Sequence, residues 1–330
     1  MDSNILRGIH LVDNIHLGLE FRYFNHDLLG LALNKTKFDG EHIKFIFKAV
    51  VEQLQSLHAA GVVHRDIKTS NILVGNNGEV VLTDFGHSVS LKKAINSFNC
   101  GTLNYSSPEM VKGFLLKNKN VETNDIDPIA ADIWSLGCVL AELIIGFPLF
   151  YGARTNSQMI LKFFQFFGKL QIFDDLTPFL SETEKNFIQV REFKEHPLKT
   201  NFYSKYSLTN KDLLDLLFDI LNPEPKLRPS IADILNHSSL ENFDESNAKI
   251  SLVSKLVSVD KDCHELKIKN QLVNNNNAAK KKSEFPSHLI RNGYSTERVN
   301  SNLLNKRNHE VSRAASYPMS STQKERYKFI

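Results

Sequence analysis

A short segment near residue 65 carries the side chains with the clearest chemistry. Residues 64–71 read HRDIKTSN, and DFG follows at residues 84–86. Asp66 could receive a hydroxyl proton, and Lys68 could place a positive charge against a phosphate. Asn71 and Asp84 offer oxygen atoms of the kind that Mg²⁺ prefers. These residue types at this spacing predict a site for phosphoryl transfer.

Two predicted elements would position these side chains. Residues 41–60 have apolar side chains at helical spacing and are followed by Gly61, which predicts a helix directly before HRDIKTSN. The short apolar runs 72–74 and 80–82 flank Asn76-Asn77-Gly78, which predicts a hairpin with an Asn-Gly turn. This hairpin would bring both candidate magnesium ligands to the same end of its two strands.

The rest of the pattern predicts more helix than strand. Two strands joined by a turn are expected at residues 5–12 and 15–21, because both runs are rich in Ile, Leu and Phe and are separated by Asp13-Asn14. Further helices are expected at residues 130–145, 158–167, 211–221 and 230–236.

Charge is unevenly distributed along the chain. The 330 residues include 40 Lys and Arg and 37 Asp and Glu, a net charge of +3, and residues 241–330 hold 16 of the basic and 10 of the acidic ones. The tail is therefore basic and the rest mildly acidic. Residues 275–330 include Asn and Lys runs and are expected to be mostly disordered, because they cannot bury enough apolar surface to offset the ordering entropy. Whether 241–273 is partly helical is left open.

Several classes of protein are disfavoured. The three cysteines are widely spaced, which suggests neither a disulfide framework nor a zinc site and favours a reducing compartment. The first residues lack the apolar core of a secretory signal, and no apolar run reaches about 18 residues, so we expect no membrane partner. No basic stripe accompanies aromatic residues, so we expect no nucleic-acid partner. We expect an intracellular protein, with the nucleus favoured over the cytoplasm because Lys280-Lys281-Lys282 is a candidate import patch.

Five motifs occur in order along the chain: HRDIKTSN at 64–71, DFG at 84–86, GTLNYSSPE at 101–109, DIWSLG at 132–137, and Arg228 in PEPKLRPS. Together they resemble the eukaryotic protein kinases, and the similarity runs from about residue 4 to about residue 240. The segments 21–31 and 132–152 resemble those of cyclin-dependent kinases in the CMGC group, and an expected insert of about 40 residues at roughly 169–209 also fits that group. The resemblance implies a Ser/Thr kinase that uses ATP and Mg²⁺ and acts on protein substrates.

The resemblance implies roles for residues of the nucleotide site. Asp66 and Lys68 would be catalytic, with Lys68 also contacting the γ-phosphate, and Asn71 and Asp84 would hold Mg²⁺. The adenine would face Phe21 as gatekeeper and bond the backbone of the next three residues, and an acid would lie near the ribose; plain core packing is the alternative for Phe21. These further residues are Arg22, Tyr23, Phe24 and Asp27.

Other matched positions would be regulatory or structural. Arg65 would pair with a phosphate on the activation segment, and Thr102 would pack beside the catalytic residues. Ser97 is a candidate phosphorylation site, although a plain polar loop residue is the alternative. The remaining matches are structural: a buried Glu109–Arg228 ion pair, and Asp132 accepting backbone hydrogen bonds from the catalytic loop.

The expected fold is α+β and protein-kinase-like. Residues 1–30 would be a two-strand remnant of the N-terminal β lobe with the hinge, 31–240 a mostly helical C-terminal lobe, and 241–330 a basic, Asn/Ser/Lys-rich, largely disordered tail. The family's first three strands, its glycine-rich loop, its phosphate-binding Lys and its cyclin-docking helix would precede residue 4. Two strands alone make a marginal sheet with uncovered apolar surface.

Two functions from different classes remain open. The first is a cyclin-dependent-like Ser/Thr kinase, N-terminally incomplete and weakly active or inactive as written, with a possible cyclin-like activator. The second is a truncated pseudokinase that acts as a binding or scaffold protein. The family's usual preference for proline after the target residue is in doubt, because Gly101 and Ser106 replace a bulky residue and an Arg. His87 is a separate departure, because an apolar residue usually follows DFG.

Overall fold

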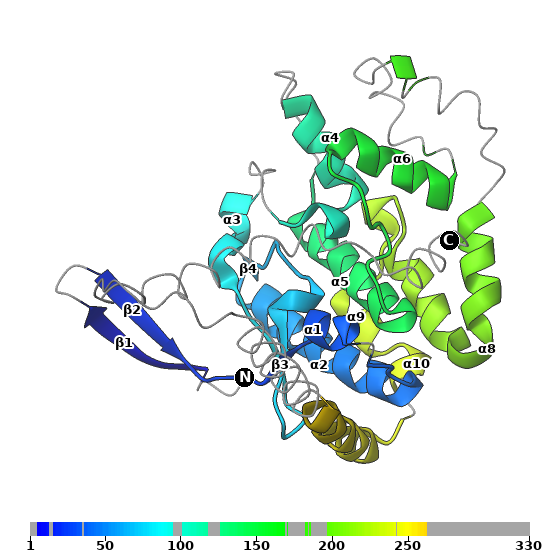
Figure 1. Cartoon of the computed structure of the whole chain (residues 1–330). Coiled ribbons are helices and arrows are strands. Elements are labelled where there is room, and N and C mark those ends of the chain that lie inside the picture. The colour runs from blue at the N-terminus through cyan, green and yellow to red at the C-terminus, as the bar shows by residue number, and fades with distance from the viewer. Residues whose placement is uncertain are drawn as a thin grey trace, which may run out of the picture. The chain divides into compact units, whose positions relative to one another are not determined.

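A computed structural model describes residues 5–12, 16–34, 36–94, 101–117, 126–168, 170, 182–183, 185, 197–241 and 243–262. Almost all of them belong to one compact unit, Met1–Val259, in which short strands accompany a body of helices (Figure 1). The strands are β1 Leu6–Val12, β2 His16–Phe21, β3 His26–Asp27, β4 Val62–Val63, β5 Ile72–Val74, β6 Val80–Leu82 and β7 Val89–Ser90.

The helices make up most of this unit. The α-helices are α1 Leu28–Leu33, α2 Gly40–Ala59, α3 Leu91–Ala94, α4 Pro108–Lys117, α5 Pro128–Ile145, α6 Asn156–Phe167, α8 Pro197–Ile220, α9 Ile231–Leu235 and α10 Ser238–Glu241. The 3₁₀ turns are η1 Thr69–Asn71, η2 Phe85–His87, η3 Leu103–Tyr105 and η5 Pro225–Leu227. A further helix covers residues 245–262.

The strands β1 and β2 confirm the first expected pair and form an antiparallel hairpin. Ile9 pairs with Leu19 and Leu11 with Leu17, so these four side chains lie on one face. Each is between 52% and 70% exposed. The hairpin therefore carries the uncovered apolar surface that the sequence predicted.

Helix α2 confirms the helix expected at 41–60, and its ends follow from its sequence. Asp39 accepts a hydrogen bond from the backbone N–H of His42, whose side chain bonds back in a capping box. The apolar residues spaced along one side are buried, among them Phe47 and Leu54. Gly61 follows the helix with φ of 70°, a conformation that suits glycine, and turns the chain toward residue 64.

The strands β5 and β6 form the expected hairpin and extend it to a third strand. The sheet order is β3-β5-β6, and the backbone N–H of Thr83 donates to the carbonyl of Asn71 at 2.9 Å beyond the last paired residues. Asn71 and Asp84 therefore leave the hairpin at the same end, as predicted. At the other end Gly78 has φ of 74°, which favours glycine in the turn.

Helix α5 lies at the centre of the helical body. Asp127 caps its start through the backbone N–H groups of Ile129 and Ala130, and Gly146, with φ of 84°, ends it. By length and composition its 18 residues, with a mean hydropathy of 1.7, could cross a membrane, so the expectation that no such apolar run exists was wrong. The apolar character has a structural cause, because 72% of this window is buried inside the protein.

Helix α8 begins earlier than the sequence analysis predicted. The expected helix at 211–221 starts at Pro197, inside the expected insert of 169–209, whose predicted end is therefore wrong. The reason is a further aromatic contact: Phe202 is fully buried, with its ring 5.9 Å from Phe166 and 6.0 Å from Phe218. This packing recruits the preceding residues into the same helix.

The sequence left open whether residues 241–273 are partly helical, and the structure shows a helix at 245–262. Its residues Leu252 and Leu256 are fully buried, and Lys48 of α2 donates to Glu245 at 3.1 Å. Side-chain atoms of Lys249 and Val253 lie within contact distance of the Gly78 turn. The helix therefore packs on α2 and on the hairpin that carries Asn71 and Asp84. The disorder expected at 275–330 lies outside the described residues.

Candidate active site

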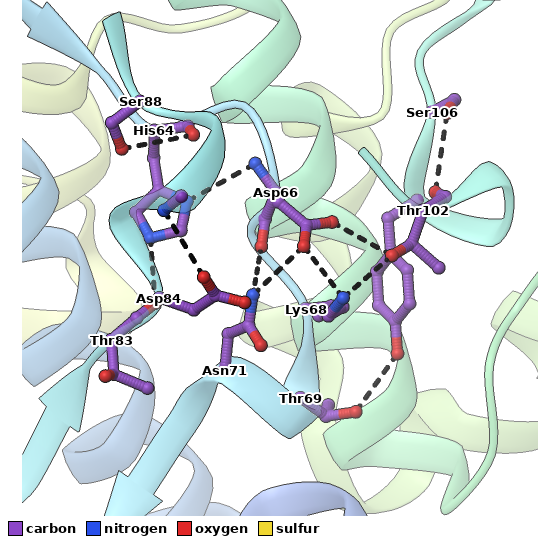
Figure 2. Close-up of polar contacts among 12 residues, drawn as sticks. His64, Asp66, Lys68, Thr69, Asn71, Thr83, Asp84, Ser88, Thr102 and Ser106 are labelled. Atoms are coloured by element: carbon purple, nitrogen blue, oxygen red, sulfur yellow. Dashed lines mark hydrogen bonds and ion pairs between the residues drawn. The ribbon is translucent and has the colours of Figure 1, made fainter. Parts of the chain in front are cut away.

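Asp66 lies at the centre of a hydrogen-bonded cluster drawn in Figure 2. Lys68 Nζ is 2.7 Å from Asp66 Oδ2 and 3.0 Å from Thr102 Oγ1, and the Thr102 hydroxyl donates to Asp66 Oδ1 at 2.9 Å. The Asn71 amide nitrogen donates to the Asp66 carbonyl at 2.9 Å and to Oδ2 at 3.2 Å. Three residues of the HRDIKTSN segment thus converge, as predicted, with the threonine of the GTLNYSSPE segment.

The environment of Asp66 keeps its carboxylate ionised. Burial, with only 5% of the residue exposed, favours the neutral acid. The hydrogen bond and charge of Lys68, together with the hydrogen bonds from Thr102 and Asn71, outweigh this effect, so the pKa of Asp66 lies below its ordinary value. A carboxylate held in this state can accept a hydrogen bond or a proton from an incoming hydroxyl.

Asn71 and Asp84 present oxygen atoms suited to a hard cation. The amide nitrogen of Asn71 donates hydrogen bonds to Asp66. The side-chain oxygen of Asn71 is therefore the atom that can bind a ligand. Asp84 is exposed and has φ of 64°, and its Oδ1 accepts from the backbone N–H of Gly86 at 3.3 Å. This left-handed backbone, followed by a glycine, turns the chain directly after the carboxylate.

Asn71 and Asp84 suit a Mg²⁺ ion that also binds the phosphates of a nucleotide better than a metal ion bound only by protein side chains. Among the described residues no cluster of three or more His, Cys, Asp or Glu could hold a metal ion. Mg²⁺ usually takes one or two protein oxygens together with water and the phosphates of a nucleotide. An amide oxygen and a carboxylate at one end of a hairpin match that requirement.

Asp132 of α5 fixes the backbone of the loop that carries Asp66, as predicted. Its fully buried carboxylate accepts from the backbone N–H groups of His64 at 2.8 Å and Arg65 at 2.7 Å, and it lies 2.9 Å from His58 Nε2. Arg65 has φ of 68°, an uncommon conformation for a residue with a side chain, and these bonds hold it there. Its Nε donates to the carbonyl of His87 at 2.7 Å, which ties the loop to the segment after DFG.

His64 is fully buried, and its uncharged ring packs between the Asp66 loop and the segment that holds Thr83 and Phe85. Burial lowers its pKa below the ordinary value, against the charge of Asp132 and the hydrogen bond to Thr83. Its Nε2 lies 3.1 Å from the Thr83 carbonyl, while Nδ1 accepts from the Asp66 N–H at 3.3 Å. These partners require a neutral ring protonated at Nε2. The ring also contacts Phe85, with centroids 5.2 Å apart, and so connects the two halves of the site.

The predicted ion pair of Glu109 and Arg228 is present and buried. Arg228 Nη1 and Nη2 lie 2.6 and 2.7 Å from the two carboxylate oxygens of Glu109, a bidentate arrangement. The guanidinium also donates to the Ala130 carbonyl at 2.8 Å and to the Asn222 carbonyl at 2.8 Å, and it lies over the ring of Trp134. The pair fastens α4 to α5 and to the loop before α9.

The segment expected to bind adenine runs from Phe21, the last residue of β2, to Phe24, just before β3. Phe21 is 55% and Tyr23 is 82% exposed, whereas Phe24 is largely buried beneath the Arg22 guanidinium. Arg22 pairs with Glu79 in the β5–β6 turn. Exposure of the two aromatic rings argues against plain core packing for Phe21, and its role at adenine stays a prediction.

The structure does not test the functional roles predicted for Asp27 and Ser97. Asp27 caps α1, where its carboxylate accepts from the Gly30 N–H at 2.7 Å, so this side chain has a structural use whatever its relation to the ribose. Ser97 lies outside the described residues. Its role as a phosphorylation site therefore stays a prediction.

A buried triad beside the site was not predicted from the sequence. Tyr105 donates to Glu142 Oε2 at 2.5 Å, and the Thr69 hydroxyl lies 3.2 Å from Oε1 and 3.0 Å from the Tyr105 hydroxyl. All three side chains are buried. The available signal was an acid in the middle of the apolar run 133–145. The triad joins the catalytic loop, η3 and α5 around one carboxyl group.

Burial shifts the ionisation of Glu142, the one carboxyl group of this triad, into the neutral range. It raises the pKa of Glu142 from 4.5 to about 7, although the hydrogen bonds from Tyr105 and Thr69 favour the ionised form. The folded state therefore binds this proton more tightly than the unfolded state does. The resulting stabilisation is complete below pH 4.5 and is lost as the pH rises through 7.

We expect Glu142→Gln to remove this pH dependence, because Gln keeps the shape and cannot ionise. Between pH 5 and 8 the wild-type chain should lose about 1–3 kcal/mol more stability than the variant does. Urea unfolding followed by fluorescence of the single tryptophan, Trp134, measures the difference at each pH. Glu241→Gln, an exposed acid in α10, is the control and should follow the wild-type curve. Parallel curves for wild type and Glu142→Gln would contradict the assignment.

Comparison with known proteins places this geometry in context. A family model described as the protein kinase domain matches residues 3–240. The CTD kinase subunit alpha of Schizosaccharomyces pombe is 38% identical over 162 residues, which are 48% of this chain and 26% of that protein. Cyclin-dependent kinase 12 of Caenorhabditis elegans is 30% identical over 258 residues, which are 77% of this chain and 33% of that protein. The matched regions are thus a third or less of the length of these two relatives.

A solved structure shares the fold. The yeast RNA Pol II CTD kinase CTDK-1 complex contains a chain that matches with a TM-score of 0.59 and 24% identity, over 72% of this chain and 75% of that chain. This likeness concerns the architecture.

Proposed function

The chain belongs to the protein kinase family, with cyclin-dependent-like features of the CMGC group, and from this premise we propose that it transfers the γ-phosphate of ATP to Ser or Thr hydroxyls of proteins. The observation that supports the proposal most strongly is the contact of Lys68 and Thr102 with opposite oxygens of the Asp66 carboxylate. A base that is ionised, oriented and next to an ammonium group is what hydroxyl phosphorylation needs.

Each residue of the cluster has a separate task in this proposal. Asp66 accepts the hydrogen bond of the substrate hydroxyl and takes its proton as the oxygen attacks phosphorus. Lys68 opposes the negative charge that develops on the transferred group. Asn71 and Asp84 would hold Mg²⁺, which when bound neutralises the charge of the phosphates. Asp132 and His64 act indirectly, because they hold the loop on which Asp66 lies.

The relatives support further proposals about partners and location. Their names describe a cyclin-dependent kinase and CTD kinases, one of RNA Pol II. By likeness we propose protein substrates, a cyclin-like activating subunit and a nuclear location for this chain.

The printed sequence favours weak or no activity of the isolated 330-residue polypeptide. Its first Lys is Lys35 and no glycine-rich loop occurs in residues 1–64, so we expect few side chains of this polypeptide to contact the phosphates of a nucleotide. Each such contact can contribute several kcal/mol to transition-state stabilisation. The same observation favours a second candidate function, a binding or scaffold protein that keeps the catalytic residues without using them.

Asp84→Asn separates the two functions. Asn tolerates the left-handed backbone and keeps an oxygen for Gly86, so the fold should persist, while affinity for the metal falls. For a kinase we expect Mg²⁺ to strengthen ADP binding by calorimetry, and the variant to lower this Mg²⁺-dependent gain at least about tenfold. Sensitive single-turnover assays with labelled ATP should then detect transfer by the wild type and a loss in the variant.

The control and the contrary result are well defined. Asp219→Asn makes the same chemical change at an exposed position of α8 and should leave binding and transfer unaltered. Transfer that stays undetectable, with nucleotide binding indifferent to Mg²⁺ and to Asp84→Asn, would favour the scaffold function.

A further inference from the structure

A groove of about 280 Å³ adjoins the Asp66 cluster on the side of α4 and α6. It shares Gly101, Ser106 and Met110 with the smaller pocket that Asp66 and Thr102 line. A polypeptide that places a hydroxyl at Asp66 would therefore have the groove beside it. The other residues that line the groove are His87, Leu103, Val111, Phe114, Arg154, Thr155 and Asn156.

The end of the groove nearest Asp66 is open and apolar. Gly101 has φ of 86°, and a Cβ there would lie 2.7 Å from the Arg65 carbonyl, so no side chain can stand at this position. The Ser106 hydroxyl is small and lies 3.4 Å from the Thr102 carbonyl (Figure 2). Leu103, Met110 and Phe114 are half-buried and offer their remaining apolar surface to the groove.

The far rim of the groove carries one formal charge. Arg154 is exposed, and its backbone N–H donates to Gln158 Oε1 at 2.8 Å, which fixes its position just before α6. Among the described residues that line the groove, none is an Asp or Glu. A guanidinium in such a setting favours a carboxylate or a phosphate, which it can bind through two parallel hydrogen bonds.

We propose that this groove selects the sequence around the phosphorylated hydroxyl of the substrate. It takes an apolar side chain next to the acceptor and an anionic side chain, carboxylate or phosphate, two or more residues away from it. The inference rests on the proposed kinase function and adds to it a substrate class: segments with an acidic or already phosphorylated residue near the target Ser or Thr. Arg154 is the residue that sets this charge preference.

Fluorescence anisotropy with labelled peptides tests the groove without requiring turnover. The peptides share one central Ser and one neighbouring Leu, and carry Asp, phosphoserine, Ala or Lys two or three residues from the Ser on either side. We expect Asp and phosphoserine peptides to bind about 3–10-fold more tightly than the Lys peptide on one of the two sides. Comparison of Asp with phosphoserine shows which anion the groove prefers.

Arg154→Glu should reverse the order of the Asp and Lys peptides, and Arg154→Ala should abolish the difference between them. Arg7→Ala, an exposed arginine on β1, is the matched control and should leave all affinities unchanged. Equal affinity of the wild type for Asp and Lys peptides, or a preference that survives Arg154→Ala, would overturn the inference.

Transfer assays with the same peptides keep the two proposals apart. Absence of transfer to every peptide, together with nucleotide binding that is indifferent to Mg²⁺ and to Asp84→Asn, would count against the kinase function, and a binding preference that is still present would leave the groove assignment standing. Transfer to all peptides at the same rate and equal binding would support the kinase function and reject the groove assignment.

Discussion

Asp66→Asn should slow phosphate transfer by about 10²–10⁴-fold, the range expected when a positioned general base is removed. Asn has nearly the same shape and keeps one of the two oxygens, which can still accept from Lys68, while its amide group can donate to the Thr102 hydroxyl. Asn cannot take the proton of the substrate hydroxyl. Nucleotide binding should change little, because Asn71 and Asp84 are the proposed metal ligands. Single-turnover transfer from labelled ATP, expressed relative to the wild-type rate of the same polypeptide, measures the effect.

Asp219→Asn serves again as the matched control for this substitution. It should keep the wild-type rate, and the melting temperature of both variants should stay near that of the wild type. A rate that falls less than about tenfold in Asp66→Asn would show that Asp66 does not act as the base.

Arg228→Met should destabilise the folded chain by about 3–5 kcal/mol, the range for breaking a buried ion pair from one side. The substitution leaves the Glu109 carboxylate buried without its partner and also removes donors from the carbonyls of Ala130 and Asn222. Urea unfolding at pH 7, followed by Trp134 fluorescence, gives the loss in the free energy of unfolding.

A double variant and a surface pair sharpen this test. Glu109→Leu combined with Arg228→Met should be less destabilised than Arg228→Met alone, because no unpaired charge remains. Arg22→Met makes the same change in the partly exposed pair with Glu79, and should cost no more than about 1 kcal/mol. Equal losses for Arg22→Met and Arg228→Met would contradict the special role of the buried pair.

The catalytic loop was predictable from sequence because its chemistry is local. Asp66, Lys68 and Asn71 lie within six residues of one another, and the hairpin that brings Asp84 to them is marked by an Asn-Gly turn. The Glu109–Arg228 pair spans 119 residues and was predicted only through the resemblance to kinases. No local pattern could have supplied it.

The features that escaped prediction depend on packing between distant segments. Glu142 is an isolated acid in an apolar helix until Tyr105 and Thr69 meet it. The early start of α8 depends on the aromatic contacts of Phe202, and the burial of α5 decides between a core helix and a membrane span. Arg154 has no motif around it and gains a possible role only from its place on the rim of the groove.

The helix at 245–262 changes how the limits of this domain should be drawn. The family match ends at residue 240, yet Leu252 and Leu256 lie beyond that point and are fully buried. A polypeptide that ends at residue 240 would expose apolar surface on α2 and would lose the helix that contacts the Gly78 turn. A polypeptide made for expression should therefore extend past residue 240 and include the helix at 245–262.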